Sequence, residues 1–201
     1  MVRQSGAAEA ASYARTGGQI SVGLHLDLGE WVHRNQEWVP RYTVVPVEDS
    51  LAVADEFVRQ LSEFEKLVGR KPTHIDSHQH VHRQEPVRSI VAKAAQDLGI
   101  PLRDITPGLH YCGDFYGQDS DGQPLPGALT IENLTRILAS LPPGTTELGC
   151  HPGYGDDLAT VYRNERAIEV QVLCTPGLRE LIGQMDIYLC SFTELASQNG
   201  R

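Results

Sequence analysis

Apolar residues recur along the chain with two different periods, which separate short strands from longer helices. Brief apolar runs predict buried strands at residues 20–26, 73–76, 101–105, 145–150 and 187–190. Apolar residues at a spacing of three or four predict amphipathic helices over residues 47–68, 86–98, 131–141 and 164–184. An alanine-rich helix is predicted over residues 7–15, ended by Gly17 and Gly18, and the remaining long stretches at 29–46 and 107–127 are predicted to be loops.

Boundary residues agree with several of these helices. Thr130 is predicted to cap the helix that follows it, Gly69 and Gly99 are predicted to end two others, and Pro176 is predicted to break the last one. The alternation of strands and helices is typical of a parallel sheet, open or closed into a barrel. Because no repeat or linker marks a second domain, residues 1–201 are predicted to form one α/β domain.

Polar residues with catalytic chemistry lie where the predicted strands end. In parallel α/β folds, functional sites gather at the carboxyl ends of strands. His25, Asp76 and His151 each stand at or just after such an end. They are therefore candidates for one functional site.

The densest cluster is the segment 73–82, which holds four of the eight histidines of the chain, at positions 74, 78, 80 and 82. Neutral imidazole is a common ligand of divalent metals, and a nearby carboxylate such as Asp76 can ligate the metal or orient an imidazole. Alternate positions share one face only while a chain stays extended, and a turn is predicted after Asp76. At least one metal ligand is expected here; a solvated polar turn is the alternative.

Three more residues have two interpretations each. His25 lies between two leucines, where a hydrogen-bonded core histidine is the ordinary case, but a histidine cluster at another strand end favours a ligand. His151 is a candidate general acid at a strand exit, or else a turn residue. Arg103 either pairs with a carboxylate near the site or is a strand-end charge. Residues 156–157 are acidic and are expected to be loop residues or helix caps.

Composition limits the kinds of partner that this chain is expected to bind. The formal net charge of −9 disfavours nucleic acid and anionic membranes, and leaves neutral or cationic ligands. No apolar run approaches the roughly 18 residues of a membrane span, and no apolar signal region opens the chain, so a cytoplasmic location is expected. The four cysteines are far apart and form no C-x-x-C pair, which predicts reduced, mostly buried thiols rather than a thiolate zinc cluster: Cys112, Cys150, Cys174 and Cys190.

Four stretches resemble the YdjC-like family, which includes chito-oligosaccharide deacetylases and hopanoid-associated deacetylases. They are residues 23–26 (GLHL), 71–82 (KPTHIDSHQHVH), 115–117 (FYG) and 147–154 (ELGCHPGY). The start of the last helix, at residues 175–178, is also similar. The resemblance thus runs through most of the chain, and its histidine-rich stretch is highly specific.

The resemblance implies an incomplete TIM-like (β/α) barrel with one divalent metal ion, Mg²⁺ or Zn²⁺. The implied ligands are His25, His78 and an aspartate from an N-terminal Asp-Asp-x-Gly motif. No Asp-Asp pair precedes His25 in this sequence, and no strand that would carry one is predicted. The expectation is therefore an N-terminally truncated domain with impaired activity. Its exposed strand edge must be covered or will associate, as in a homodimer.

The implied reaction is removal of N-acetyl groups from amino sugars or chito-oligosaccharides. In that reaction His151 would protonate the leaving amine, and Asp76 would orient a ligand histidine or contact the sugar. Further expected substrate contacts are Arg103, Tyr116, Tyr154 and His80. One alternative is a non-catalytic carbohydrate-binding or regulatory remnant of the family. The other is a metal-dependent phosphoesterase, which normally needs more carboxylates beside its histidines.

Overall fold

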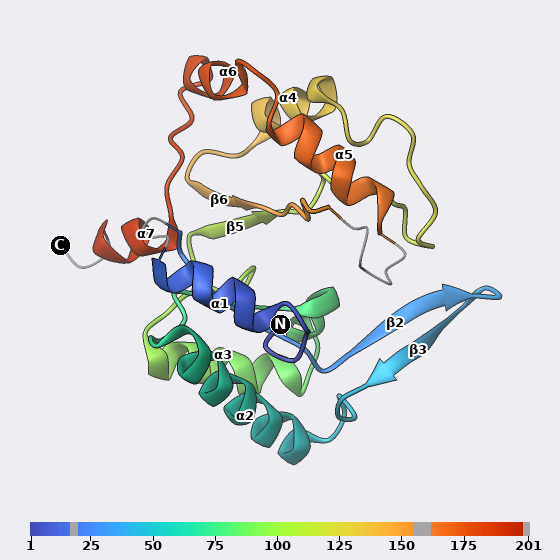
Figure 1. The fold of residues 1–201 in the computed structure, drawn as a ribbon, viewed down its shortest axis with the longest axis vertical. Helices are drawn as coiled ribbons and strands as arrows, with labels where there is room; N and C mark the ends of the chain where they lie inside the picture. Colours follow the sequence, from blue (N-terminus) through green and yellow to red (C-terminus); the bar gives the residue numbers. More distant parts are fainter. Residues whose placement is uncertain (17–19, 155–161, 199–201) are drawn as a thin grey trace. The chain divides into compact units, whose positions relative to one another are not determined.

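A computed structural model describes residues 1–16, 20–154 and 162–198, and Figure 1 shows its helices and strands. The predicted helix end at Gly17 and Gly18 and the acidic pair at 156–157 lie outside these residues. The chain divides into two compact units. Unit 1 comprises Met1–Arg34, Trp38–Pro107 and Cys190–Arg201, and unit 2 comprises Asn35–Glu37 and Gly108–Leu189. The hypothesis of one domain over residues 1–201 stays a prediction.

The centre of unit 1 is a pair of parallel strands, β1 (Leu24–Leu26) and β4 (Ile75–Ser77). Leu24, Leu26 and Ile75 are fully buried, which explains why these short apolar runs form strands. Residue 25 pairs with residue 76 in the register, so their side chains lie on the same face of the sheet. Two predicted strands are shorter than expected: only residues 24–26 of 20–26 are a strand, and 101–105 contribute a single bridge at Leu102.

Four helices complete unit 1. They are α1 (Ala7–Thr16), α2 (Ser50–Val68), α3 (Val87–Leu98) and α7 (Phe192–Gln198). Asp49 caps α2 by accepting hydrogen bonds from two main-chain N–H groups of its first turn. Gly69 and Gly99 end α2 and α3 in the left-handed conformation, with φ of 76° and 69°. The predictions for α2 and α3 are thus correct to within a few residues, whereas the strand predicted at 187–190 is wrong and the chain forms α7 just beyond it.

The loop predicted over residues 29–46 is wrong. This stretch forms a hairpin of β2 (Gly29–Arg34) and β3 (Glu37–Thr43), which lie side by side in Figure 1. Asn35 and Gln36 make the turn with φ of 51° and 67°, the positive values that a tight two-residue hairpin turn requires. No residue of β3 is buried, so the strand carries no alternating apolar pattern that would reveal it in the sequence.

The histidine-rich stretch leaves β4 as the short 3₁₀ segment η1 (His78–Arg83). Gln79 and His80 adopt left-handed backbone angles, with φ of 49° and 55°. This change of direction confirms the predicted turn after Asp76. It also means that the alternate residues of 74–82 do not share one face.

Unit 2 contains a second parallel pair, β5 (Leu109–Cys112) and β6 (Thr145–Leu148). Its helices are α4 (Ile131–Ser140), α5 (Asn164–Leu173) and α6 (Leu178–Gln184). The side chain of Thr130 caps α4 by accepting from the main-chain N–H of Asn133, as predicted. The predicted break near Pro176 separates α5 from α6. Strand β5 corrects the prediction of an uninterrupted loop over 107–127.

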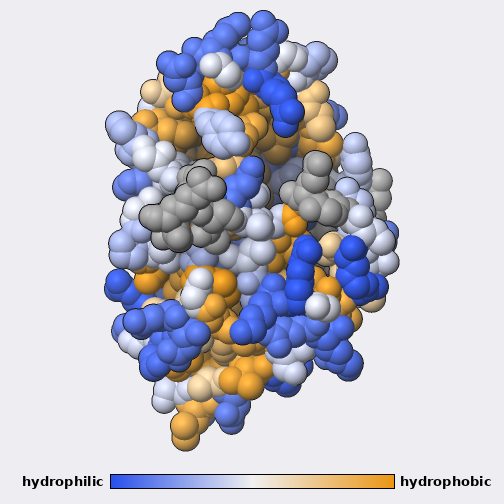
Figure 2. All heavy atoms as spheres, turned by 90° about the vertical axis from the view of Figure 1, so that its left-hand side faces the viewer, coloured by the Kyte–Doolittle hydropathy of each residue, from blue (hydrophilic) through white to orange (hydrophobic). Residues whose placement is uncertain are grey.

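The described residues therefore have a mixed α/β fold, as predicted. Their strands form three two-stranded sheets, β1–β4, β2–β3 and β5–β6, and within residues 1–16, 20–154 and 162–198 these sheets do not close into a barrel. In the same ranges, no helix is both long enough and apolar enough to cross a bilayer. On the face drawn in Figure 2, apolar side chains are interrupted by hydrophilic ones.

Candidate active-site residues

In unit 1, a buried carboxylate joins two of the predicted residues. Asp76 Oδ2 lies 2.7 Å from His25 Nδ1 and 2.7 Å from Arg103 Nη1. The pairing of β1 with β4 explains the first contact, and the bridge between Leu102 and Ile75 brings Arg103 alongside. Of the two interpretations of Arg103, the structure supports pairing with a carboxylate. The guanidinium is only 15% exposed, so the ion pair is largely shielded from water.

The surroundings of Asp76 keep its carboxyl group ionised. Burial opposes the charge, but the hydrogen bond from His25 and the nearby Arg103 outweigh it and hold the pKa of Asp76 well below its usual range. An ionised carboxylate only accepts hydrogen bonds, so His25 Nδ1 carries the proton. In the neutral imidazole, Nε2 then has the free lone pair that a metal or a donor group can use.

His78 presents a second imidazole nitrogen close to His25. The two ring centroids are 5.7 Å apart with an angle of 69° between the ring planes. His78 Nε2 is buried and has no hydrogen-bond partner among the described residues. Burial and the neighbouring His25 lower the pKa of His78, which favours the neutral form that binds cations.

These two imidazoles fit part of the donor set of a divalent metal ion. Each offers a ring nitrogen, and one of the two rings is oriented by a carboxylate, as is common around metals. In the part of the chain that the structure describes, however, His, Cys, Asp and Glu side chains form no group of three that could hold a metal ion. His25 and His78 are therefore two candidate ligands of a metal ion.

The other histidines of the cluster have different surroundings. His82 is fully buried, with Nδ1 2.6 Å from Ser77 Oγ and Nε2 3.1 Å from the main-chain oxygen of Arg103. A carbonyl oxygen only accepts, so His82 Nε2 donates, and the ring holds the main chain of Arg103 in place. The ring of His74 stacks on Phe192 of α7 at 3.8 Å. His80 is half-buried, and burial together with Arg83 lowers its pKa to about 4.

One buried carboxylate of unit 1 was missed in the sequence. Asp27 follows β1 and is fully buried. Its Oδ1 accepts hydrogen bonds from the main-chain N–H of Gly29 at 3.2 Å and from the hydroxyl of Tyr42 at 3.1 Å. The side chain of Gln60 accepts a hydrogen bond from the main-chain N–H of Asp27 and donates one to the main-chain oxygen of Asp27. Asp27 therefore fixes the start of the hairpin to α2, and its place directly after a buried strand was the available signal.

In unit 2, His151 belongs to a second cluster. Its main-chain N–H donates a short hydrogen bond to Glu169 Oε2. The His151 ring meets Tyr116 and Tyr162 edge to face, with centroids 5.4 and 5.7 Å away. The two tyrosine rings stack nearly parallel, 4.5 Å apart. Tyr116 is thus beside a candidate catalytic histidine, whereas Tyr154 is 77% exposed.

Glu169 and Tyr162 are cluster residues that the sequence interpretation missed. Glu169 is fully buried, and burial raises its pKa in spite of hydrogen bonds from Tyr162 and from the His151 main chain. A signal did exist, because Glu165, Glu169 and Val172 recur on the single buried face of α5. Charged residues at core positions of a helix indicate buried hydrogen bonding.

The four cysteines are free thiols, but the expectation that most of them are buried is wrong. Cys112 and Cys150 are half-buried, and Cys174 and Cys190 are exposed. Cys112 and Cys174 stand at the ends of β5 and α5, where the core covers them only in part. Burial raises the pKa of Cys150, next to His151, to about 12, so its thiol stays protonated near neutral pH.

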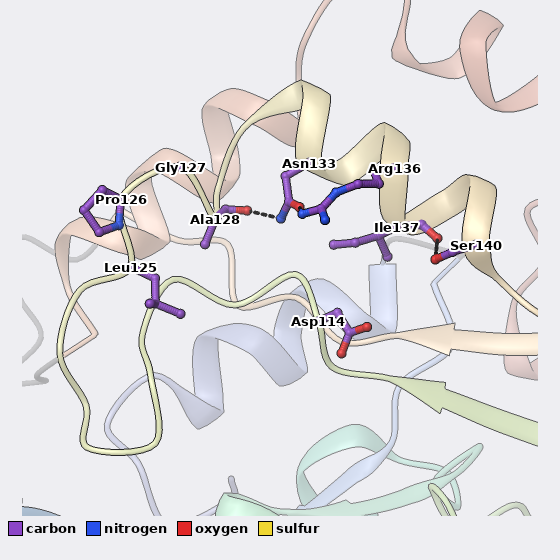
Figure 3. Close-up of a pocket in the computed structure, with 9 residues that line it drawn as sticks. All are labelled: Asp114, Leu125, Pro126, Gly127, Ala128, Asn133, Arg136, Ile137 and Ser140. Atoms are coloured by element: carbon purple, nitrogen blue, oxygen red, sulfur yellow. Dashed lines mark hydrogen bonds between the residues drawn. The ribbon is translucent and has the colours of Figure 1, made fainter.

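A broad depression of about 830 Å³ lies elsewhere in unit 2 and contains none of the predicted site residues (Figure 3). Two of its polar side chains are already bonded to nearby main-chain oxygens: Asn133 to Ala128 at 2.6 Å and Ser140 to Ile137 at 2.8 Å. Its lining residues are Asp114, Leu125, Pro126, Gly127, Ala128, Asn133, Arg136, Ile137 and Ser140.

Buried histidine–carboxylate clusters on a mixed α/β fold are characteristic of enzymes, because active sites concentrate such perturbed groups. The chain belongs to the YdjC-like protein family, whose model matches residues 1–184.

Three relatives have deacetylase names. A chitooligosaccharide deacetylase of Serratia marcescens is 30% identical over 97% of this chain and 86% of its own length. Carbohydrate deacetylases of Mus musculus and Vibrio parahaemolyticus are 31% and 30% identical, over 73% and 74% of this chain. These two alignments cover 63% and 60% of the relatives, so they span less than two thirds of those proteins.

A solved structure shares the fold. It is a protein from Enterococcus faecalis proposed to cleave cellobiose phosphate, and it superposes with a TM-score of 0.64 over 94% of this chain and 83% of that one. The sequence identity is 22%, so this likeness supports the fold and not the reaction.

Proposed function

We propose that this chain is a metal-dependent carbohydrate deacetylase that hydrolyses the acetamido group of an amino sugar or chito-oligosaccharide. Family membership and the names of three relatives support the reaction class. The observation that carries the proposal is the pair of imidazoles of His25 and His78, 5.7 Å apart, with His25 held by Asp76.

In this proposal His25 and His78 hold a divalent cation, Mg²⁺ or Zn²⁺. When bound, such an ion supplies polarisation of the amide carbonyl and acidification of water. Asp76 fixes the ring orientation of His25 and, by accepting its Nδ1 proton, makes Nε2 a better donor. Arg103 keeps Asp76 ionised and in place, with His82 anchoring the main chain of Arg103.

His151 is the proposed general acid of the reaction. The leaving group of an amide is an amine, a poor leaving group until its nitrogen is protonated. An imidazole titrates near neutral pH and can deliver that proton. Tyr116, Tyr154 and His80 remain proposed sugar contacts, because flat rings suit the apolar faces of a pyranose.

We also infer that the strands are parts of an incomplete TIM-like (β/α) barrel. Its support is the order of strands and helices along the chain and the parallel pairing within β1–β4 and β5–β6. The relative in the solved structures shares the fold at a TM-score of 0.64.

The function is tested by measuring acetate release from N,N′-diacetylchitobiose together with the metal content after zinc or magnesium loading. His78→Ala should lose bound metal and at least about 100-fold in activity, since one of two protein ligands is removed. His110→Ala, an exposed histidine on β5, is the control and should behave like the wild type. Full metal content and activity in His78→Ala would contradict the proposal.

The family remnant that binds sugar without catalysis is the second candidate. It is favoured by the finding that no three His, Cys, Asp or Glu side chains among the described residues form a group that could hold a metal ion. Calorimetry with the same disaccharide separates the two. Sugar binding without acetate release at any metal concentration would identify the remnant.

A further inference from the structure

Both carboxylate oxygens of Glu169 are used by groups that surround the candidate general acid. Oε2 accepts the main-chain N–H of His151, and Oε1 accepts the hydroxyl of Tyr162 at 2.5 Å. Both partners are donors, and Glu169 is fully buried in α5. The side chain therefore joins the helix to the turn that carries His151.

Tyr162 continues the connection to a third segment. Its hydroxyl donates to Glu169 and accepts the main-chain N–H of Gly117 at 2.9 Å. Its ring stacks on Tyr116 with an angle of only 3° between the planes. The hydroxyl thus has a donor and an acceptor partner, and swinging the whole side chain away from Tyr116 would move this oxygen and break both bonds.

The imidazole of His151 lies against this arrangement. It meets the rings of Tyr162 and Tyr116 at 67° and 68°. The turn beyond it is tied to α5 a second time, because the N–H of Gly153 donates to the main-chain oxygen of Arg166 at 3.2 Å. The backbone of His151 is thus fixed from one side by Glu169, and its ring is bounded by two stacked tyrosines.

We propose that Glu169 and Tyr162 are positioning residues that fix the backbone and ring of His151 for proton donation to the leaving amine. The inference rests on the proposed function, in which His151 is the general acid. Neither residue needs to touch the substrate. Glu169 acts through the His151 main chain, and Tyr162 acts through ring contact and the Gly117 main chain.

This role predicts a loss that depends on the leaving group. An amine must be protonated as it leaves, whereas the 4-nitrophenolate of 4-nitrophenyl acetate leaves without a proton. A displaced acid therefore slows the amide reaction selectively, while general damage to the fold slows both reactions. The ratio of the two rates reports on the placement of His151.

The experiment compares kcat/KM for N,N′-diacetylchitobiose and 4-nitrophenyl acetate in the metal-loaded chain. In Glu169→Gln, an N–H donor replaces one of the two acceptor oxygens, so the bond from the His151 main chain is lost or the bond from Tyr162 is lost or reversed. Tyr162→Phe removes the hydroxyl alone. In both variants kcat/KM for the disaccharide should fall about 10- to 100-fold, within the range that a positioned acid contributes, with less than about a threefold fall for the ester.

Matched controls are Glu180→Gln, on the exposed side of α6, and Tyr188→Phe, which replaces a tyrosine that is 75% exposed. Both controls should match the wild type on both substrates. Equal losses on the two substrates in Glu169→Gln and Tyr162→Phe, or no loss on either, would overturn the positioning role.

A second measurement needs no activity. The ring carbon–proton signal of His151 in NMR spectra, assigned by its loss in His151→Gln, should be a single sharp peak in the wild type. It should broaden or split in Glu169→Gln and Tyr162→Phe. An unchanged signal would overturn the positioning role. A wild-type chain that releases no acetate would instead overturn the proposed function, and the NMR signal would still decide whether Glu169 orders His151.

Discussion

Two buried carboxylates of this chain have opposite surroundings. Asp76 in unit 1 is held between the imidazole of His25 and the guanidinium of Arg103, and its pKa is depressed. Glu169 in unit 2 accepts hydrogen bonds from the neutral donors of Tyr162 and the His151 main chain, and burial raises its pKa. Burial alone therefore does not set the charge of a carboxylate; the charges of its partners do.

The different partners of Asp76 and Glu169 suit two different roles. A carboxylate beside a guanidinium stays ionised and can orient an imidazole that binds a cation, as proposed for Asp76 and His25. A carboxylate with neutral donors fixes a backbone and a neighbouring ring, as proposed for His151. Substitutions around Asp76 should therefore change metal affinity, and substitutions around Glu169 should change the stability of unit 2.

The largest expected effect is on metal affinity in unit 1. In Asp76→Asn, the partner of His25 Nδ1 loses its charge, and zinc affinity measured by calorimetry should weaken about 10- to 100-fold. Asp97→Asn is the control, because that carboxylate is 60% exposed and pairs with Lys93 on the same helix. An unchanged isotherm for Asp76→Asn would remove the distinction between the two carboxylates.

The next effect is on the stability of unit 2. Tyr162→Phe leaves Glu169 Oε1 and the N–H of Gly117 without their shared partner, and should lower the free energy of unfolding by about 1–3 kcal/mol. Urea unfolding measures the change, with Tyr188→Phe as control. The zinc affinity of Tyr162→Phe should stay at the wild-type value. A fall in zinc affinity as large as that of Asp76→Asn would mean that Tyr162 also supports the metal site.

A smaller effect tests whether packing supports the same cluster. A Cβ at Gly117 would lie 2.7 Å from Leu129 Cδ1 and 2.8 Å from Glu165 Cγ. Gly117→Ala should therefore cost about 1–2 kcal/mol of unfolding free energy through overpacking. Gly183→Ala in α6, where a Cβ meets nothing within 4 Å, is the matched control and should be neutral or stabilising. Equal stability of the two variants would show that Leu129 and Glu165 move aside at no cost and that Gly117 is not required for packing.

The smallest effect concerns a third buried carboxylate, Glu56, which should behave like Asp76. Burial opposes its ionisation, but hydrogen bonds from Arg59 and Gln60 lower its pKa. A depressed pKa contributes stability above the unfolded-state pKa, and this contribution is lost as the pH falls. Glu56→Gln should thus cost about 1 kcal/mol at pH 7 and progressively less below about pH 4. A cost independent of pH would contradict this assignment.

Much of the first cluster was visible in the sequence, because its residues sit at the ends of apolar runs. His25 and Asp76 were named as site candidates from those positions, and His78 was named as a ligand from the resemblance to the YdjC-like family. The structure brings the three side chains close together. The choice between pairing and isolation for Arg103 needed the register of β1, β4 and Leu102, which the sequence does not show. The division of roles among the four clustered histidines depended on the left-handed turn at Gln79 and His80.

The second cluster was visible only in part. His151 was predicted from its place after an apolar run. The spacing of Glu165 and Glu169 marked charged positions on α5 but not their partners, because the contact of Glu169 with His151 is to the main chain. The hairpin was missed for a different reason, since β3 has no buried residue and hence no apolar alternation. Sequence patterns thus revealed burial and helix ends well, and tertiary hydrogen bonds poorly.

X-ray absorption of the zinc-loaded chain shows whether the imidazoles of His25 and His78 bind one cation. Nitrogens from two histidines are expected at about 2.0–2.1 Å from zinc, with one histidine signal lost in His78→Ala. Sulfur ligands at about 2.3 Å, or the same spectrum in His78→Ala, would contradict this expectation.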